Sequence, residues 1–153
     1  MINYITKNQK GFIWQELVVV VAVTGIIVLV AGLLLHSSRQ NTRDLKRLAD
    51  IKTIGHALEL YYYDCNVYPT QIVANKQISG VDACQGNIYM QYVPIDPDGF
   101  AYNYIPCRDE TIRECKADLK NPGAYKILYE LESNTEGIMK GPHMATPGLF
   151  VAQ

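Results

Sequence analysis

The amino-terminal part of the chain carries one uninterrupted apolar run. Leu17–Leu35 is nineteen residues long, and Thr24 is its only polar side chain. A hydrocarbon core about 30 Å thick needs about 20 helical residues, so the run is long enough to cross a membrane. Every backbone N–H and C=O group in lipid must be paired within the segment, and a single span is therefore helical. The pattern predicts a transmembrane helix half over residues 12–36.

The pattern changes from Ser37 onward, where apolar residues recur at steps of three and four. No proline interrupts residues 37–63. This spacing predicts an amphipathic helix half that lays one face under a sheet. A single helix from about Phe12 to Tyr63 would be about 78 Å long at about 1.5 Å per residue. The predicted apolar face contains Leu48, Ile51, Gly55, Leu58 and Tyr62, and the polar face contains Lys46, Asp50, Thr53 and His56.

Residues 64–153 predict a small head of antiparallel strands. Pro94–Gly99 (PIDPDG) has turn chemistry, since proline sets φ, aspartate bonds its own backbone and glycine accepts positive φ. Ala101–Ile105 and Ala124–Leu131 alternate in polarity and predict a hairpin packed on the helix. We expect the tail, 137–153, to be irregular or to follow a sheet edge, and we assign it no role. The fold class is therefore α+β.

The four cysteines all follow the apolar run. An even number of cysteines in a small exported head indicates two disulfides, for which three connectivities are possible. We expect Cys107 and Cys115 to close the insertion between the two hairpin strands on itself. Cys65 and Cys84 would then tie the helix end to the loop that follows it.

Composition narrows the function classes. The formal charge of −1 gives no basic footprint for nucleic acid. The sequence has no glycine-rich phosphate loop, no H-E-x-x-H zinc motif and no nucleophile with a base at a recognisable spacing. We expect His36 and His56 to be interfacial or solvated side chains, and we assign no special role to His143 in the glycine- and proline-rich tail. The protein is predicted not to be an enzyme.

Glu16 places a carboxylate at the edge of the apolar run. An ionised acid deep in a bilayer costs about 2.5–3.5 kcal/mol on insertion scales, so it needs a partner or a place at the headgroup boundary. Position alone allows either.

The residues around Glu16 favour the first reading. The segment Lys10–Leu17 (KGFIWQEL) resembles the processing site of type IV prepilins and type II secretion pseudopilins. The resemblance implies a leader, 1–11, that a prepilin peptidase removes after Gly11, with methylation of the new amino terminus at Phe12. Glu16 is then the fifth mature residue, and we expect its carboxylate to pair with the Phe12 amine of the same or a neighbouring subunit, because buried charges are costly unless paired.

Two further segments resemble this family. Arg43–Pro69 is similar to the second helical half of pseudopilins, and Tyr92–Tyr104 to a turn and strand of their head. Heads of this family often hold calcium, and five residues of this head could supply oxygen ligands. The D-P-D-G spacing lacks the ladder of an EF-hand loop, and we expect solvated turn acids and no cofactor. The nominated residues are Asp96, Asp98, Glu132, Asn134 and Glu136.

The resemblance predicts a structural subunit of a type IV pilus or pseudopilus-like fibre with a pilin-like fold. Its partners would be further copies of itself in a helical fibre, the prepilin peptidase and the assembly machinery. The precursor would be a single-pass protein of the cytoplasmic membrane, and the fibre periplasmic or extracellular. Basic residues lie on both sides of the span, so the export direction rests on the resemblance and the cysteines.

The alternative is a non-polymerising single-pass membrane protein with a disulfide-bonded exported binding head. The apolar run and the cysteines would look the same in both. The sequence does not distinguish motility, adhesion, DNA uptake and secretion, nor a major from a minor subunit.

Overall fold

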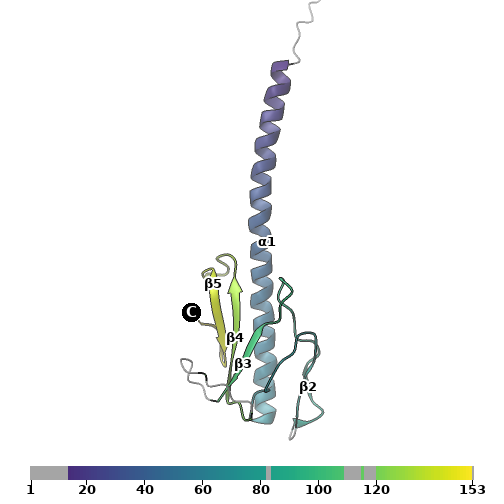
Figure 1. Cartoon of the computed structure of the whole chain (residues 1–153), viewed down its shortest axis with the longest axis vertical. Helices are drawn as coiled ribbons and strands as arrows, with labels where there is room; N and C mark the ends of the chain where they lie inside the picture. The colour runs from purple at the N-terminus through teal and green to yellow at the C-terminus, as the bar shows by residue number, and fades with distance from the viewer. Residues whose placement is uncertain (1–13, 82–83, 109–114, 116–119, 153) are drawn as a thin grey trace, which may run out of the picture. The chain divides into compact units, whose positions relative to one another are not determined.

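One long helix, α1 (Trp14–Cys65), precedes all the strands in a computed structural model of the chain (Figure 1). The structure describes residues 14–81, 84–108, 115 and 120–152. The predicted leader, 1–11, lies outside the described residues. The chain divides into a first compact unit that ends at Arg39 and a second, the head, that begins at Gln40. The expected α+β class, with a long helix before small antiparallel sheets, is confirmed.

The part of α1 in the first unit exposes its apolar side chains. The exposed fraction of the large side chains between Leu17 and Leu35 ranges from 50% at Val23 to 73% at Leu33. Among the described residues, α1 is long and apolar enough to cross a membrane, by length and composition. The described part of the predicted span begins at Trp14, which is 78% exposed.

The part of α1 in the head buries one face. Ile54 and Leu58 are fully buried at the centre of the core, together with Leu48 and Ile51. The predicted face is wrong at its end, because Tyr61 is 2% exposed and the neighbouring Tyr62 is 37% exposed. The next buried residue lies three positions after Leu58 rather than four. Tyr61 therefore shares the buried helix face with Ile54 and Leu58.

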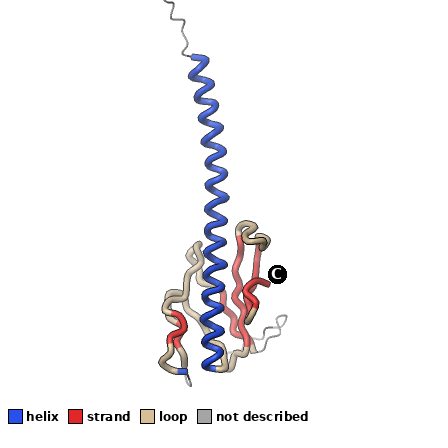
Figure 2. Tube along the Cα trace, turned by 180° about the vertical axis from the view of Figure 1, so that it is seen from behind, coloured by secondary structure: helices blue, strands red, loops and turns tan. Residues whose placement is uncertain are grey.

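The main sheet of the head has four antiparallel strands in the order β3-β4-β5-β6. The predicted hairpin forms, with Tyr104 opposite Ile127, although β3 begins two residues later than expected. Figure 2 shows this sheet on one side of the head's part of α1 and the short β1-β2 pair on the other. The strands are β1 (Ile78–Ser79), β2 (Ile88–Met90), β3 (Asn103–Cys107), β4 (Ala124–Leu131), β5 (Gly141–Thr146) and β6 (Leu149–Ala152).

Of the two expectations for the tail, the second is confirmed. Its described part follows the edge of the main sheet as β5 and β6. Thr146 lies opposite Leu149, so Pro147 and Gly148 form the turn between the two strands. Gly148 has φ +70°, a value that glycine adopts without steric cost and that suits the position after proline in a tight turn. Local turn chemistry therefore converts a segment rich in glycine and proline into a hairpin.

The carboxyl end of α1 is closed by local chemistry. Asn66 adopts φ 56°, a left-handed conformation that asparagine tolerates after a helix, and its N–H donates to the Tyr62 carbonyl at 2.8 Å. The disulfide Cys65–Cys84 then joins the last residue of α1 to the segment between β1 and β2.

Candidate functional site

Two features of the chain stand out as functional candidates: the apolar first unit of α1 and a group of charges around a buried arginine in the head. Glu16 is the acidic residue in the first turn of α1, where the helix dipole favours negative charge. Gly11 and Phe12, the predicted cleavage and methylation positions, lie outside the described residues.

The one polar side chain of the apolar run makes its hydrogen bond within the helix. The Thr24 hydroxyl donates to the Val20 carbonyl one turn earlier, so it needs no water or partner. A Cβ atom built at Gly25 or Gly32 would meet nothing within 4 Å. These glycines are therefore not required for packing within the described chain.

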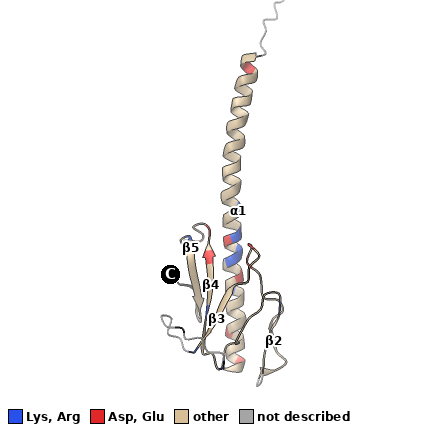
Figure 3. Cartoon of the chain, in the orientation of Figure 1, with Lys and Arg blue, Asp and Glu red and all other residues tan. Residues whose placement is uncertain are grey.

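Acidic and basic positions lie together on the head's part of α1 (Figure 3). Arg47 is at their centre and is 3% exposed. Its Nε and Nη2 donate to the two carboxylate oxygens of Asp96 at 2.9 and 3.2 Å. Nη2 also donates to Asp98 at 2.6 Å, and Nη1 to Asp44 at 2.8 Å and to Glu132 at 2.6 Å. We name this group the charge cluster; its members are Arg43, Asp44, Arg47, Asp96, Asp98 and Glu132.

Asp44 connects the charge cluster to the loop after β4. Its side chain is fully buried, and its Oδ1 accepts from the Glu132 N–H at 3.0 Å. Its Oδ2 accepts from the N–H and the hydroxyl of Ser133, at 2.8 and 2.7 Å. One carboxylate on α1 thus satisfies two backbone donors of a loop 88 residues later in the chain.

Contacts within the cluster shift the pKa values of Glu132, Asp44 and Arg47. The hydrogen bond from Arg43 lowers the pKa of Glu132 to about 2, with a further contribution from Arg47. Burial alone would raise the pKa of Asp44, but the hydrogen bonds from Glu132 and Ser133 outweigh it, and that pKa is lowered. Burial likewise opposes the charge of Arg47, yet its hydrogen bonds to Asp96 and Glu132 raise its pKa. Glu132, Asp44 and Arg47 are therefore ionised at neutral pH.

The oxygen donors nominated for calcium are engaged elsewhere. Asp96, Asp98 and Glu132 contact Arg47. The Asn134 side-chain oxygen accepts from the Lys140 N–H at 2.8 Å, and Glu136 lies 3.8 Å from the Lys52 ammonium on the surface. Within the described residues no group of three histidine, cysteine or acidic side chains is arranged to hold a metal ion.

The turn before β3 places the two aspartates of the charge cluster. The Asp98 N–H donates to Asp96 Oδ1 at 2.9 Å, and the Gly99 N–H donates to the Asp96 carbonyl at 2.7 Å. Gly99 has φ +89°. These are the turn features that the PIDPDG segment predicts, and they point both carboxylates at Arg47.

Comparison with known proteins identifies the family. Residues 35–124 match the family model for type II secretion system protein G, which is more than half of the chain. This chain belongs to that family. The expected resemblance to secretion pseudopilins is thereby confirmed at the level of the family.

Relatives of the protein G family match over most of their length. The chain is 26% identical to the type II secretion system core protein G of Aeromonas hydrophila over 65% of this chain and 74% of the relative. It is 27% identical to the protein of the same name from Vibrio cholerae over 68% of this chain and 75% of the relative. No solved structure matches the chain significantly.

Both expected disulfides are present in the protein G head, Cys65–Cys84 and Cys107–Cys115. The second lies at the end of β3 and closes part of the insertion between β3 and β4, most of which lies outside the described residues.

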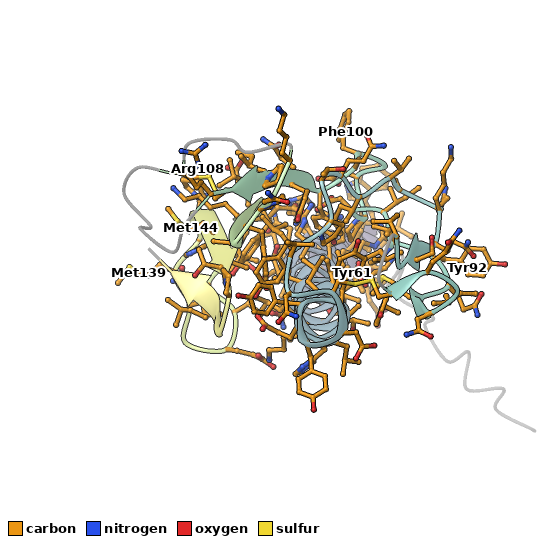
Figure 4. The ribbon with its side chains drawn as sticks, turned by 90° about the horizontal axis from the view of Figure 1, so that it is seen from below. Tyr61, Tyr92, Phe100, Arg108, Met139 and Met144 are labelled. Atoms are coloured by element: carbon orange, nitrogen blue, oxygen red, sulfur yellow. A yellow bond between two sulfur atoms is a disulfide. The ribbon has the colours of Figure 1, made fainter. Side chains whose placement is uncertain are left out.

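Three of the most exposed apolar side chains of the head lie apart from one another. Tyr92, Phe100 and Met139 are all exposed, and they point in three different directions in Figure 4. These three side chains therefore do not form one apolar patch. The longest continuous run of exposed apolar side chains among the described residues is that of the first unit of α1.

Proposed function

We propose that this protein is a structural, non-catalytic subunit of a pseudopilus-like fibre in a type II secretion system, and that it polymerises through the first unit of α1. The supporting observation is the contrast between the two units. The head closes its own core, with Ile54 and Leu58 fully buried, whereas the apolar side chains of the first unit are exposed. That surface needs a second environment, lipid before assembly and neighbouring helices afterwards.

The same exposed apolar surface supports a membrane location for the precursor. The first unit anchors the precursor in the cytoplasmic membrane, and the head is exported, where an oxidising compartment maintains Cys65–Cys84 and Cys107–Cys115. Assembly then transfers the apolar surface from lipid to a periplasmic or extracellular fibre. Gly25 and Gly32 let neighbouring helices approach closely, since neither glycine packs within its own chain.

The proposed maturation step is cleavage between Gly11 and Phe12 by a prepilin peptidase. Cleavage creates an amino-terminal cation four residues before Glu16. Methylation of that amine keeps its charge, so it remains a partner for the Glu16 carboxylate. This pairing in turn sets the register of helices that would otherwise slide on an apolar surface.

Intact-mass measurement of the protein from membranes of its native source tests the proposal. A mature chain that begins at methylated Phe12, together with fibres in electron micrographs, is the expected result. Gly11→Leu should leave the leader attached and abolish fibres, while Gln9→Leu, which adds the same side chain within the leader, should be processed normally. Fibres built from uncut Gly11→Leu protein would contradict the proposal.

Intact mass and electron micrographs also distinguish the proposed fibre subunit from the alternative, a non-polymerising membrane protein with a binding head. That protein would retain Met1 in its mature form and would yield no fibres in any variant.

A further inference from the structure

We infer that Arg47 takes the place of a metal ion in this head, so that its fold is independent of calcium. The inference concerns the monomer, and it stands or falls separately from cleavage and fibre formation. It rests on the partners of the residues considered above as possible calcium ligands.

The guanidinium of Arg47 uses its whole donor capacity. A guanidinium carries five N–H donors in a planar fork. Arg47 makes five contacts with carboxylate oxygens, at 2.6 to 3.2 Å. The acceptors come from three segments: Asp44 from α1, Asp96 and Asp98 from the turn before β3, and Glu132 from the loop after β4. One side chain therefore ties together the segments that a bound cation would otherwise have to join.

The position of Arg47 excludes a calcium ion from the same place. Calcium needs six to eight oxygen ligands at about 2.3–2.6 Å around one centre. The carboxylates of Asp96 and Glu132 instead meet at a buried guanidinium, and Arg43 donates a second fork to Glu132. The remaining two oxygen donors have other partners: Asn134 accepts from the Lys140 N–H, and Glu136 pairs with Lys52.

The charge balance agrees with a built-in cation. Two guanidiniums face four carboxylates, which gives the cluster a formal charge of −2. Without Arg47 the cluster would carry a formal charge of −3 around the fully buried carboxylate of Asp44, an arrangement that favours protonation or an external cation. Because Arg47 is part of the chain, it cannot be removed by a chelator.

Thermal unfolding of the full chain in detergent micelles, followed by circular dichroism, tests the inference. The midpoint Tm in millimolar calcium should equal the Tm in millimolar EDTA within about 1 °C. This difference is much smaller than the rise in Tm that a bound ligand produces. A site filled at about 100 times its dissociation constant would raise Tm by about 10 °C in a domain of this size. A calcium-dependent rise of several degrees in the natural chain would overturn the inference.

The variant Arg47→Gln tests whether Arg47 itself replaces a bound cation. This variant should melt well below the natural chain in EDTA, and calcium should restore part of the loss. Lys52→Gln removes another α1 cation, paired at the surface with Glu136, and should leave both Tm values unchanged. An Arg47→Gln protein as stable as the natural chain in EDTA would contradict the role of Arg47. If Arg47→Gln does not fold, the calcium response of the natural chain still decides.

Discussion

Arg47 on α1 and Asp96 in the turn before β3 form a two-pronged ion pair, with Nε–Oδ2 at 2.9 Å and Nη2–Oδ1 at 3.2 Å. The two residues are 49 positions apart, and both belong to the head. Bidentate pairs of this kind fix the relative position of the segments that carry them, because both donors must stay in one plane with the carboxylate.

Replacing Asp44 should destabilise the head more than any exposed acid does. Asp44→Ala removes a buried partner of Arg47 and leaves the N–H groups of Glu132 and Ser133 without their acceptor. Breaking a buried pair from one side costs about 3–5 kcal/mol. Urea unfolding should show a loss of this size, while Glu136→Ala, whose pair is exposed, should stay within about 0.5 kcal/mol. Equal losses in the two variants would refute the central role of Asp44.

Acid should unfold the head through Glu132 and Asp44. The pKa of Glu132 is about 2 in the folded chain, below its ordinary value of 4.5, and that of Asp44 is also lowered. A depressed folded pKa contributes stability above the unfolded pKa that is lost as pH falls toward the folded one. The free energy of unfolding should therefore be flat above about pH 5 and fall between about pH 4.5 and 2.

Glu132→Gln is the control for this pH dependence. The variant should be less stable at neutral pH and lose less on acidification. Asp50 acts in the opposite sense, since burial raises its pKa despite the hydrogen bond from Tyr102. An unchanged slope in Glu132→Gln would show that other carboxylates cause the acid sensitivity.

The two disulfides should contribute different amounts to the free energy of unfolding. Cys65 and Cys84 are 19 residues apart, and Cys107 and Cys115 are 8 apart. Loop-closure entropy predicts about 3 kcal/mol for the longer loop and about 2.5 kcal/mol for the shorter one. Paired serine variants of each disulfide, compared by urea unfolding, should rank in this order. A larger loss from the short loop would indicate that strain or contacts outweigh entropy.

Leu58 and Leu60 provide a matched test of the core. Leu58 is fully buried, and Leu60, two residues later on the same helix, is exposed. Leu58→Ala should cost about 2–5 kcal/mol, because it removes buried methyl groups and leaves a cavity. Leu60→Ala should change the free energy of unfolding by less than about 0.5 kcal/mol in the monomer. Similar losses at the two positions would be incompatible with the observed helix face.

Glu16→Ala should impair assembly without affecting membrane insertion, since removing a charge eases entry into lipid. Fibre yield should fall at least about tenfold, equivalent to losing about 1.4 kcal/mol of subunit association. Membrane fractionation and fibre counting measure the two effects separately. Gln15→Ala, which leaves the carboxylate in place, should give normal fibres. An unchanged yield from Glu16→Ala would rule out the charge-pairing role.

The helix and its apolar pattern were predictable because they depend on local periodicity. Leu48, Ile51 and Leu58 are buried as predicted, and the hairpin of β3 and β4 follows from alternation and turn chemistry. The error at Tyr62 arose from extending a four-residue step where the helix required three.

The charge cluster was missed because its partners lie far apart in the sequence. A signal was nevertheless present: Asp44 and Arg47 continue the stripe of Leu48 and Ile51 at steps of three and four. Opposite charges three residues apart on an apolar stripe indicate a buried pair rather than a solvated face. Which loops complete such a pair depends on the tertiary fold, so Asp96 and Glu132 could not be assigned to Arg47 in advance.

Trp14, the first described residue of α1, is the only tryptophan in a chain with eleven tyrosines. Tryptophan emission therefore reports on one end of one helix and is silent about the head. Its wavelength should shift to the blue when that end enters lipid or a packed fibre and to the red when it meets water. The protein thus contains its own optical probe of the proposed assembly, and its natural fluorescence would report insertion and polymerisation without a label.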